Sequence, residues 1–263
     1  MFELLDLLHL PHWVLLIPVV MLFTLRWWLA PFLIKKIVKS PTEVICDYCE
    51  KGKVELPNEV RSYFATTAAG LQSLGFRATP PLRQRTAVKT SELWVQLHVR
   101  EETGDIASVA GAVTRGSAAT TVLKRLEFRT TFSDGTEQWT TNLQVPEPYG
   151  PLPGVTTTRL PRLQDAAHLY RVHRKLVAAR GGVMTKPGRL DDAIAYIRES
   201  ERRDREHKLA RGFAIEDRAE RVLRLTWRGA LALHFSTAPG FKGYRAWREA
   251  RAQEALLRQA RAA

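Results

Sequence analysis

The chain has 263 residues, of which 45% are hydrophobic and 25% are charged, the composition of an ordinary folded protein. Its formal net charge of +13 at pH 7 is unusual and implies an anionic neighbour: a membrane surface, a nucleic acid or an acidic protein. Only two cysteines are present, which excludes a scaffold held by several disulfides and favours a reducing compartment.

The first notable segment, residues 7–25, reads LLHLPHWVLLIPVVMLFTL and contains no Lys, Arg, Asp or Glu. A helix of this length spans roughly 28 Å, close to the thickness of a bilayer core. Arg26, Trp27 and Trp28 follow at once, and aromatic rings beside a snorkelling arginine suit the membrane interface. We therefore predict a membrane anchor in residues 1–38, with a transmembrane span near 7–25.

The residues after this span set its orientation. We expect Pro31 to interrupt the helix and an interfacial segment to follow it, ending at Lys35 and Lys36. A span over 13–34 is the competing register, and it would place Arg26 in hydrocarbon. No Lys or Arg precedes the span, whereas several follow it, so we expect the N-terminus outside and the C-terminal bulk in the cytoplasm.

The next part, residues 39–145, combines a helix with strands. Residues 58–74 have helical periodicity, with Asn58 as the expected cap, Gly75 as the end, and an apolar stripe formed by Val60, Phe64, Thr67, Ala68, Leu71 and Leu74. Alternating apolar residues then predict strands at 93–99, 106–113, 120–132 and 136–143. We expect an antiparallel meander with one face packed on helices.

Five prolines in residues 146–161 predict a linker, and the remaining residues, 162–263, are basic and mostly helical. From Arg159 to Ala263 there are 24 Lys and Arg against 12 Asp and Glu, whereas the preceding residues are nearly balanced. Expected helices cover 165–180, 190–211 and 244–263, and residues 221–235 indicate a strand through Thr226 followed by a turn or short helix. The fold class is therefore α+β.

Cys46 and Cys49 have the spacing of half a structural zinc site or of a redox pair. His168 and His173 could complete a Cys2His2 set if the fold brings them to the cysteines, but they lie five residues apart on one predicted helix and so do not share a face. We therefore expect structural or incidental cysteines and solvent-facing or capped histidines, with zinc as the alternative.

No other motif predicts chemistry. The sequence has no G-x-S-x-G and no H-E-x-x-H, so no catalytic and no cofactor-binding residue is proposed. Residues 198–208 (RESERRDREHK) alternate in charge sign, as in a solvent-exposed helix with internal ion pairs, and this argues against nucleic-acid binding. Arg245, Arg248 and Arg251 on the last expected helix are candidates for contact with an anionic lipid surface.

Three segments, 56–76 (LPNEVRSYFATTAAGLQSLGF), 132–142 (FSDGTEQWTTN) and 225–235 (LTWRGALALHF), resemble those of uncharacterised bacterial single-pass membrane proteins with a cytoplasmic α+β domain. The resemblance implies an integrated domain at a bacterial inner membrane. It implies no activity and no functional residue.

Three hypotheses follow. The favoured one is a non-catalytic, membrane-tethered accessory or scaffold subunit, whose partners are the bilayer and another membrane protein. The second is an enzyme that acts on a membrane-associated or anionic substrate. The third is a zinc- or redox-responsive regulator that uses Cys46 and Cys49, and only this one requires a cofactor.

Overall fold

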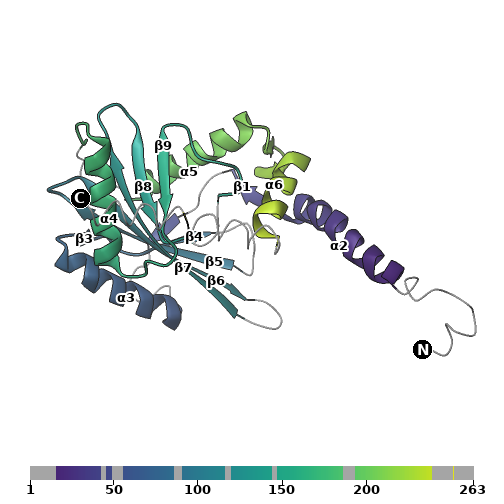
Figure 1. Ribbon diagram of the computed structural model, residues 1–263, viewed down its shortest axis with the longest axis horizontal. Helices are drawn as coiled ribbons and strands as arrows, with labels where there is room; N and C mark the ends of the chain where they lie inside the picture. Colours follow the sequence, from purple (N-terminus) through teal and green to yellow (C-terminus); the bar gives the residue numbers. More distant parts are fainter. Residues whose placement is uncertain are drawn as a thin grey trace, which may run out of the picture.

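The computed structural model describes residues 16–42, 46–48, 56–85, 91–115, 120–143, 147–185, 193–238 and 251. These residues form five helices and two β-sheets, so the mixed α+β class is confirmed (Figure 1). None of the helices in this described part of the chain has both the length and the apolar character of a membrane span.

The larger sheet has eight strands in the order β2-β4-β5-β6-β7-β8-β9, and β3 pairs with β5 beside this path. Its strands are β2 (Cys46–Tyr48), β3 (Arg77–Ala78), β4 (Leu82–Arg85), β5 (Ser91–Arg100), β6 (Asp105–Arg115), β7 (Thr120–Thr131), β8 (Glu137–Thr141) and β9 (Val155–Arg159). Strands β5 to β8 pair in chain order and antiparallel, which confirms the predicted meander.

Strand β9 lies inside the Pro-rich segment that the sequence suggested as a linker. It pairs in parallel with β8, with Glu137 opposite Val155 and Thr141 opposite Arg159. Residues 155–159 therefore belong to the larger sheet. They form its edge strand, next to β8.

Helices α3 (Asn58–Ser73) and α4 (Ala166–Arg180) cover one face of this sheet and enclose the main apolar core with β6 and β7. The predicted stripe of α3 is buried at Val60, Phe64, Thr67 and Leu71. The expected cap at Asn58 was wrong: the helix begins at Asn58, after Pro57, without a side-chain cap bond. In α4, by contrast, the Asp165 carboxylate accepts a hydrogen bond from the backbone N–H of His168.

The opposite face of the sheet is covered as well, by α5 (Ala193–Ala210), so the expectation of a single packed face was wrong (Figure 1). In β5, Trp94 and His98 are buried towards one face, whereas Val95 and Leu97 are buried towards the other. A strand buried on both sides loses the apolar–polar contrast by which one-sided packing is recognised in a sequence.

A second sheet pairs a strand that follows α2 with two strands from the C-terminal part of the chain. It contains β1 (Lys39–Pro41), β11 (Val222–Leu225) and β10 (Ala214–Asp217) in the order β1-β11-β10. Thr226 follows β11 and caps α6 (Trp227–Thr237) by accepting a hydrogen bond from the N–H of Gly229. The predicted change from strand to short helix near Thr226 is therefore confirmed.

Helix α2 (Leu16–Ile37) leads directly into β1 and packs against α6 (Figure 1). The predicted interruption at Pro31 was wrong, because the helix continues through this residue. Proline removes one backbone hydrogen bond from a helix, and packing of neighbouring residues offsets such a loss. Trp27 before the proline and Phe32 after it both contact aromatic residues of α6.

Candidate functional site

The face between α5 and the larger sheet contains most of the charged residues that the sheet buries. The first part of α5 is apolar there: Ile197 packs against a cluster that includes Val95 and Leu97. One turn further on, the inward side becomes polar, with Ser200 and Arg203 bonded to residues of β7 and β8. The interface between α5 and the sheet is therefore apolar near Ile197 and polar near Ser200 and Arg203.

Three charged side chains alternate along β7 and so share this face: Arg125, Glu127 and Arg129. Arg129 Nε donates to the Glu127 carboxylate at 2.6 Å, and its terminal nitrogen donates to Ser200 Oγ at 2.9 Å. The Arg129 guanidinium also lies 3.8 Å from the centroid of the Trp139 ring. Arg129 therefore holds α5 on the sheet while its charge is neutralised by Glu127.

Burial alone would raise the pKa of the Glu127 carboxyl, but the positive charges of Arg129 and Arg125 outweigh it, so that pKa lies below its usual range. Burial lowers the pKa of Arg129, yet the Glu127 carboxylate raises it more. Both groups are therefore charged at neutral pH. A second pair lies beside them, since Glu137 accepts hydrogen bonds from Trp139 Nε1 and from Arg203, both at 2.6 Å.

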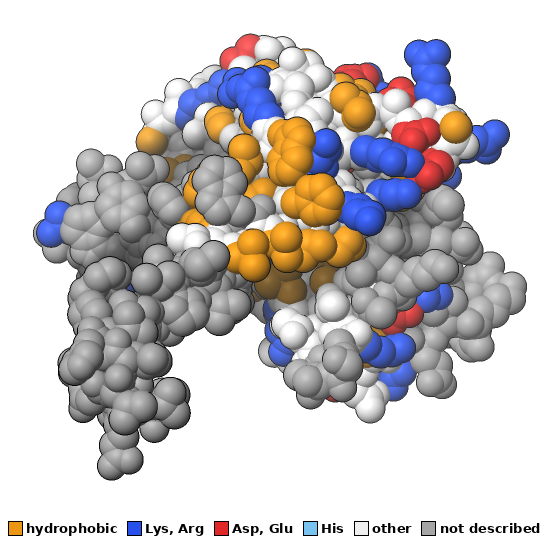
Figure 2. Space-filling model, turned by 90° about the vertical axis from the view of Figure 1, so that its right-hand side faces the viewer, with side chains coloured by type: hydrophobic (Ala, Val, Ile, Leu, Met, Phe, Trp, Pro, Cys, Tyr) orange, Lys and Arg blue, Asp and Glu red, His pale blue; other side chains and the backbone are white. Residues whose placement is uncertain are grey.

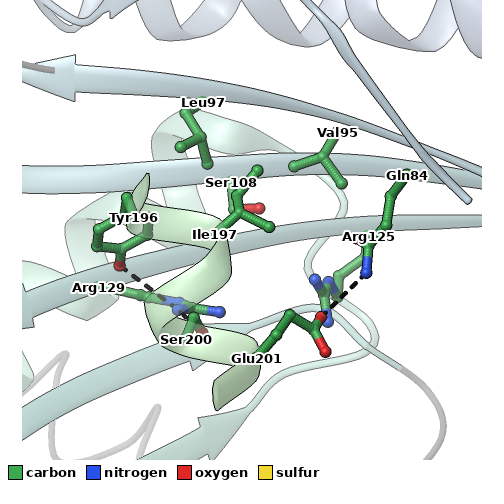
Figure 3. A pocket seen from close by; sticks show the side chains of 10 residues that line it. All are labelled: Gln84, Val95, Leu97, Ser108, Arg125, Arg129, Tyr196, Ile197, Ser200 and Glu201. Atoms are coloured by element: carbon green, nitrogen blue, oxygen red, sulfur yellow. Dashed lines mark hydrogen bonds between the residues drawn. The ribbon is translucent and has the colours of Figure 1, made fainter. Parts of the chain in front are cut away.

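Two adjoining hollows open beside these pairs. The smaller, of about 40 Å³, lies between α5 and strands β4 to β7, and in Figure 3 Arg129 reaches Tyr196 and Ser200 across it while Gln84 bonds to Glu201. The larger, of about 240 Å³, lies under residues 147–152. The residues that line both are Arg125, Arg129, Ser200 and Glu201.

Arg125 is the cation in these hollows without a salt-bridge partner among the described residues, and its buried Nε has no hydrogen-bond partner there either. Burial raises the pKa of Glu147 on the opposite wall, although Arg159 acts against this. Burial and the nearby Asp204 carboxylate raise the pKa of Tyr149 to about 12. The larger pocket thus combines the Arg125 guanidinium and a neutral phenol with the acidic side chains of Glu147, Glu201 and Asp204.

A second polar cluster lies on the α4 side and is closed. Asp105 accepts hydrogen bonds from the hydroxyls of Thr130 and Tyr170, the latter at 2.6 Å. Because Thr130 donates to Asp105, its oxygen accepts from His173 Nε2 at 2.9 Å, while His173 Nδ1 accepts from Thr140. Asp105 and His173 are fully buried, so this cluster is structural.

The residues predicted to meet the membrane interface all lie in α2. Trp27 contacts His234 of α6, and the ammonium of Lys35 lies 4.7 Å from the centroid of the Trp227 ring. Lys36 is exposed in the last turn. The side chains of Arg26 and Trp28 lie outside the described residues.

Only some of the residues of the proposed zinc site lie among the described residues. Cys46 is the first residue of β2, opposite Gln84, and Cys49 lies outside the described residues, so the cysteine pair stays a prediction. His173 does not face solvent: it is buried, and both its nitrogens are bonded to threonines. In the described part of the chain, no three His, Cys, Asp or Glu side chains are placed to hold a metal ion.

Two of the three arginines suggested for an anionic surface, Arg245 and Arg248, lie outside the described residues. Arg251 is helical and exposed. The alternating charges predicted for residues 198–208 do form ion pairs along α5, from Arg202 to Glu199 and Glu206 and from Lys208 to Asp204.

Sequence reasoning missed the charged residues of β7 entirely. The available signal was the segment 124–129, KRLEFR, in which charged residues alternate with Leu126 and Phe128. Such alternation normally marks a strand with one solvated face. Here α5 covers that face, and only the three-dimensional pairing of Glu127 with Arg129 makes this burial possible.

Comparisons with protein-family models, with curated proteins and with solved structures gave no match.

Proposed function

We propose that this protein is a membrane-tethered accessory or scaffold subunit of a membrane complex and has no catalytic activity of its own. Residues 7–25 span the membrane, the N-terminus lies outside and the α+β domain lies in the cytoplasm. The first half of this span precedes Leu16 and lies outside the described residues; its second half is the start of α2.

The observation that carries this proposal is the attachment of α2 to the rest of the molecule. Its C-terminal half contacts α6 and β11, and it continues into β1, which pairs with β11 over Lys39–Pro41. A flexible tether is sufficient to concentrate an enzyme at a membrane. A subunit that presents a surface at a set height and angle needs a rigid connection, and this packing supports one.

The internal pairing of buried charges also supports a structural role. Glu127 pairs with Arg129, Glu137 with Arg203, and Asp105 with Arg174. Catalytic carboxylates generally face a substrate-accessible space. These three carboxylates instead stabilise the contacts of the helices with the sheet.

The basic C-terminal part supplies the second element of the proposal. An anchored domain lies beside anionic lipids, where each Lys or Arg near the surface contributes about 1 kcal/mol. We assign Arg245, Arg248 and Arg251 to contact with this surface or with an acidic partner subunit.

Two experiments test the proposal. A reporter fused after Ala263 should be active only in the cytoplasm, and activity on the other side would contradict the orientation. Purification of the full chain from native membranes in mild detergent should yield a second membrane protein in stoichiometric amount. A lone protein that turns over a phosphorylated or lipid substrate would contradict the scaffold role.

The larger pocket favours a second candidate function, binding of a membrane-associated or anionic small molecule, because Arg125 has no ion-pair partner among the described residues. Glycerol 3-phosphate and inorganic phosphate are suitable probes. Titration calorimetry should show binding that Arg125→Gln abolishes and that the control Arg115→Gln, at an exposed position of β6, leaves unchanged. No heat with either probe would remove this candidate.

A further inference from the structure

Helices α2 and α6 together expose an unusually apolar surface, which we call the α2–α6 face. Its large hydrophobic side chains are between 39% and 57% exposed and are Leu25, Leu29, Phe32, Leu33, Trp227, Leu231 and Phe235. In α6 the three residues are spaced four apart and so lie on one side of the helix. Figure 2, which looks at the end of the molecule that bears these helices, shows hydrophobic side chains gathered there.

Aromatic contacts join the two helices into one surface. The rings of Phe32 and Trp227 lie 6.1 Å apart between centroids, and those of Trp27 and Phe235 lie 6.4 Å apart. The exposed side chains of α6 are therefore continuous with those of α2. Contiguous apolar surfaces of this kind on a folded protein usually mark a site of contact with another protein or a membrane.

The charges at this face point to a lipid surface. Neither α2 nor α6 contains an Asp or Glu, whereas both contain cations. Lys36 and Arg228 are exposed at the border, and Lys35 lies over the Trp227 ring. Tryptophan with neighbouring cations is the arrangement that suits the level of lipid headgroups, where the ring is half-buried and the charge meets phosphate.

The α2–α6 face also lies next to the predicted membrane span in the sequence, which agrees with a lipid surface as its partner. Helix α2 runs without a break from Leu16 to Ile37, so its exposed residues begin at the end of the apolar segment 7–25 and continue directly after it. If that segment spans the bilayer, Leu25 lies at the interface. The packing of α6 beside residues 27–35 then places Phe235, next to Trp27, nearest to Leu25, and Trp227, next to Phe32 and Lys35, further from the bilayer core.

We propose that α6 and the C-terminal half of α2 lie together in the headgroup region of an anionic bilayer, as a two-helix membrane contact. This inference rests on the proposed function, since the span in residues 7–25 sets the depth. Its consequence is that the domain has a fixed orientation, with the β1-β11-β10 sheet held close to the lipid surface.

Nitroxide labels on the full chain can test the depth of α6. The background is Cys46→Ser with Cys49→Ser, and the single labelled variants are Leu231→Cys in α6, Val19→Cys in the span and Val183→Cys as the control. Val183 is 72% exposed and lies three residues after the end of α4, which is at the opposite end of the molecule from α2 (Figure 1). The protein is reconstituted in vesicles of phosphatidylcholine and phosphatidylglycerol, and collision rates with oxygen and with a water-soluble nickel chelate are measured.

The Leu231 label should collide with oxygen several-fold more, relative to nickel, than the Val183 label, and less than the Val19 label. Equal accessibility at Leu231 and Val183, with Val19 in lipid, would overturn the α6 contact but leave the anchor intact. Water-like accessibility at Val19 would instead overturn the anchor. A Leu231 label shielded from both reagents, with spin–spin broadening, would assign the face to a second copy and overturn the inference. A Phe235→Cys label repeats the measurement if Leu231→Cys does not fold.

Discussion

The Trp27 ring of α2 meets the His234 ring of α6 edge to face, with 5.1 Å between their centroids and planes at 88°. These residues are 207 positions apart in a chain of 263, so the contact joins the N-terminal helix to the last described helix. It makes α2 an integral part of the fold. A membrane span continuous with α2 would therefore set the orientation of the whole domain.

The docking of α6 depends on the absence of a side chain at Gly229. A Cβ at this position would lie 2.0 Å from the backbone carbonyl oxygen of Phe213, and a backbone atom cannot move aside as a flexible side chain can. We expect Gly229→Ala to destabilise the protein by about 1 to 3 kcal/mol, measured by denaturant unfolding of the full chain in detergent.

Gly70 is the matched control because it is also helical, and an added Cβ there would make an ordinary contact of 3.6 Å with Ala166. Gly70→Ala should leave stability unchanged or raise it by roughly 0.5 to 1 kcal/mol. Equal effects of the two substitutions would show that α6 does not pack on Phe213 as described.

The pairing of Glu127 with Arg129 within β7 should stabilise the contact that Arg129 makes with α5. Glu127→Gln leaves the Arg129 guanidinium buried without a counter-charge, and the cost should be about 3 kcal/mol in the free energy of unfolding. The control is Glu199→Gln, which breaks an exposed pair with Arg202 on the outer side of α5 and should have no measurable effect. A similar effect of both would contradict the buried position of the pair.

The free energy of unfolding should decrease as the pH is lowered, because His173 is buried in its neutral form. Burial, opposed by Asp105 and aided by Arg174, lowers the pKa of this histidine from 6.5 to about 4. Between these values the unfolded chain takes up a proton that the folded chain does not, so stability present above pH 6.5 is lost progressively as the pH falls towards 4. The loss approaches roughly 3 kcal/mol.

Other groups also contribute to the pH dependence; burial lowers the pKa of His98 to about 4 as well. A variant isolates the contribution of His173. His173→Gln keeps a side chain that can donate to Thr130 but does not titrate. It should be less stable at pH 7 and lose less stability than the parent protein between pH 6.5 and 4. The control for loss of an imidazole is His168→Gln, at a half-buried position on the same helix, compared over the same pH range. An unchanged slope in His173→Gln would contradict the assignment.

Zinc analysis decides the hypothesis about the cysteines. We expect the purified full chain to contain far less than stoichiometric zinc, because His173 has neither ring nitrogen free for a metal. Metal content by mass spectrometry and thermal stability of Cys46→Ser are the measurements. One zinc per chain, lost in Cys46→Ser together with stability, would establish the metal site instead.

Local patterns predicted the regular elements well. The alternation at 93–99 and the stripe from Val60 to Leu71 report on residues close in sequence, and the structure places β5 and α3 there. Short strands such as β1 were not predicted, because the segment Lys39–Pro41 becomes a strand only by pairing with residues 222–224. The same limit applies to Glu127 and Arg129, whose burial depends on where α5 lies.

The central claim is the membrane anchor, and two charges placed in the span test it most directly. Val19→Lys with Val20→Lys adds about 2.5 to 3.5 kcal/mol per lysine to the cost of insertion at the centre of a span. Membranes containing the full chain are extracted with alkaline carbonate, and the protein is assayed in pellet and supernatant. The parent chain should remain in the pellet and the double variant should be released. Release of the parent chain to the same extent as the variant would contradict the anchor and the function built on it.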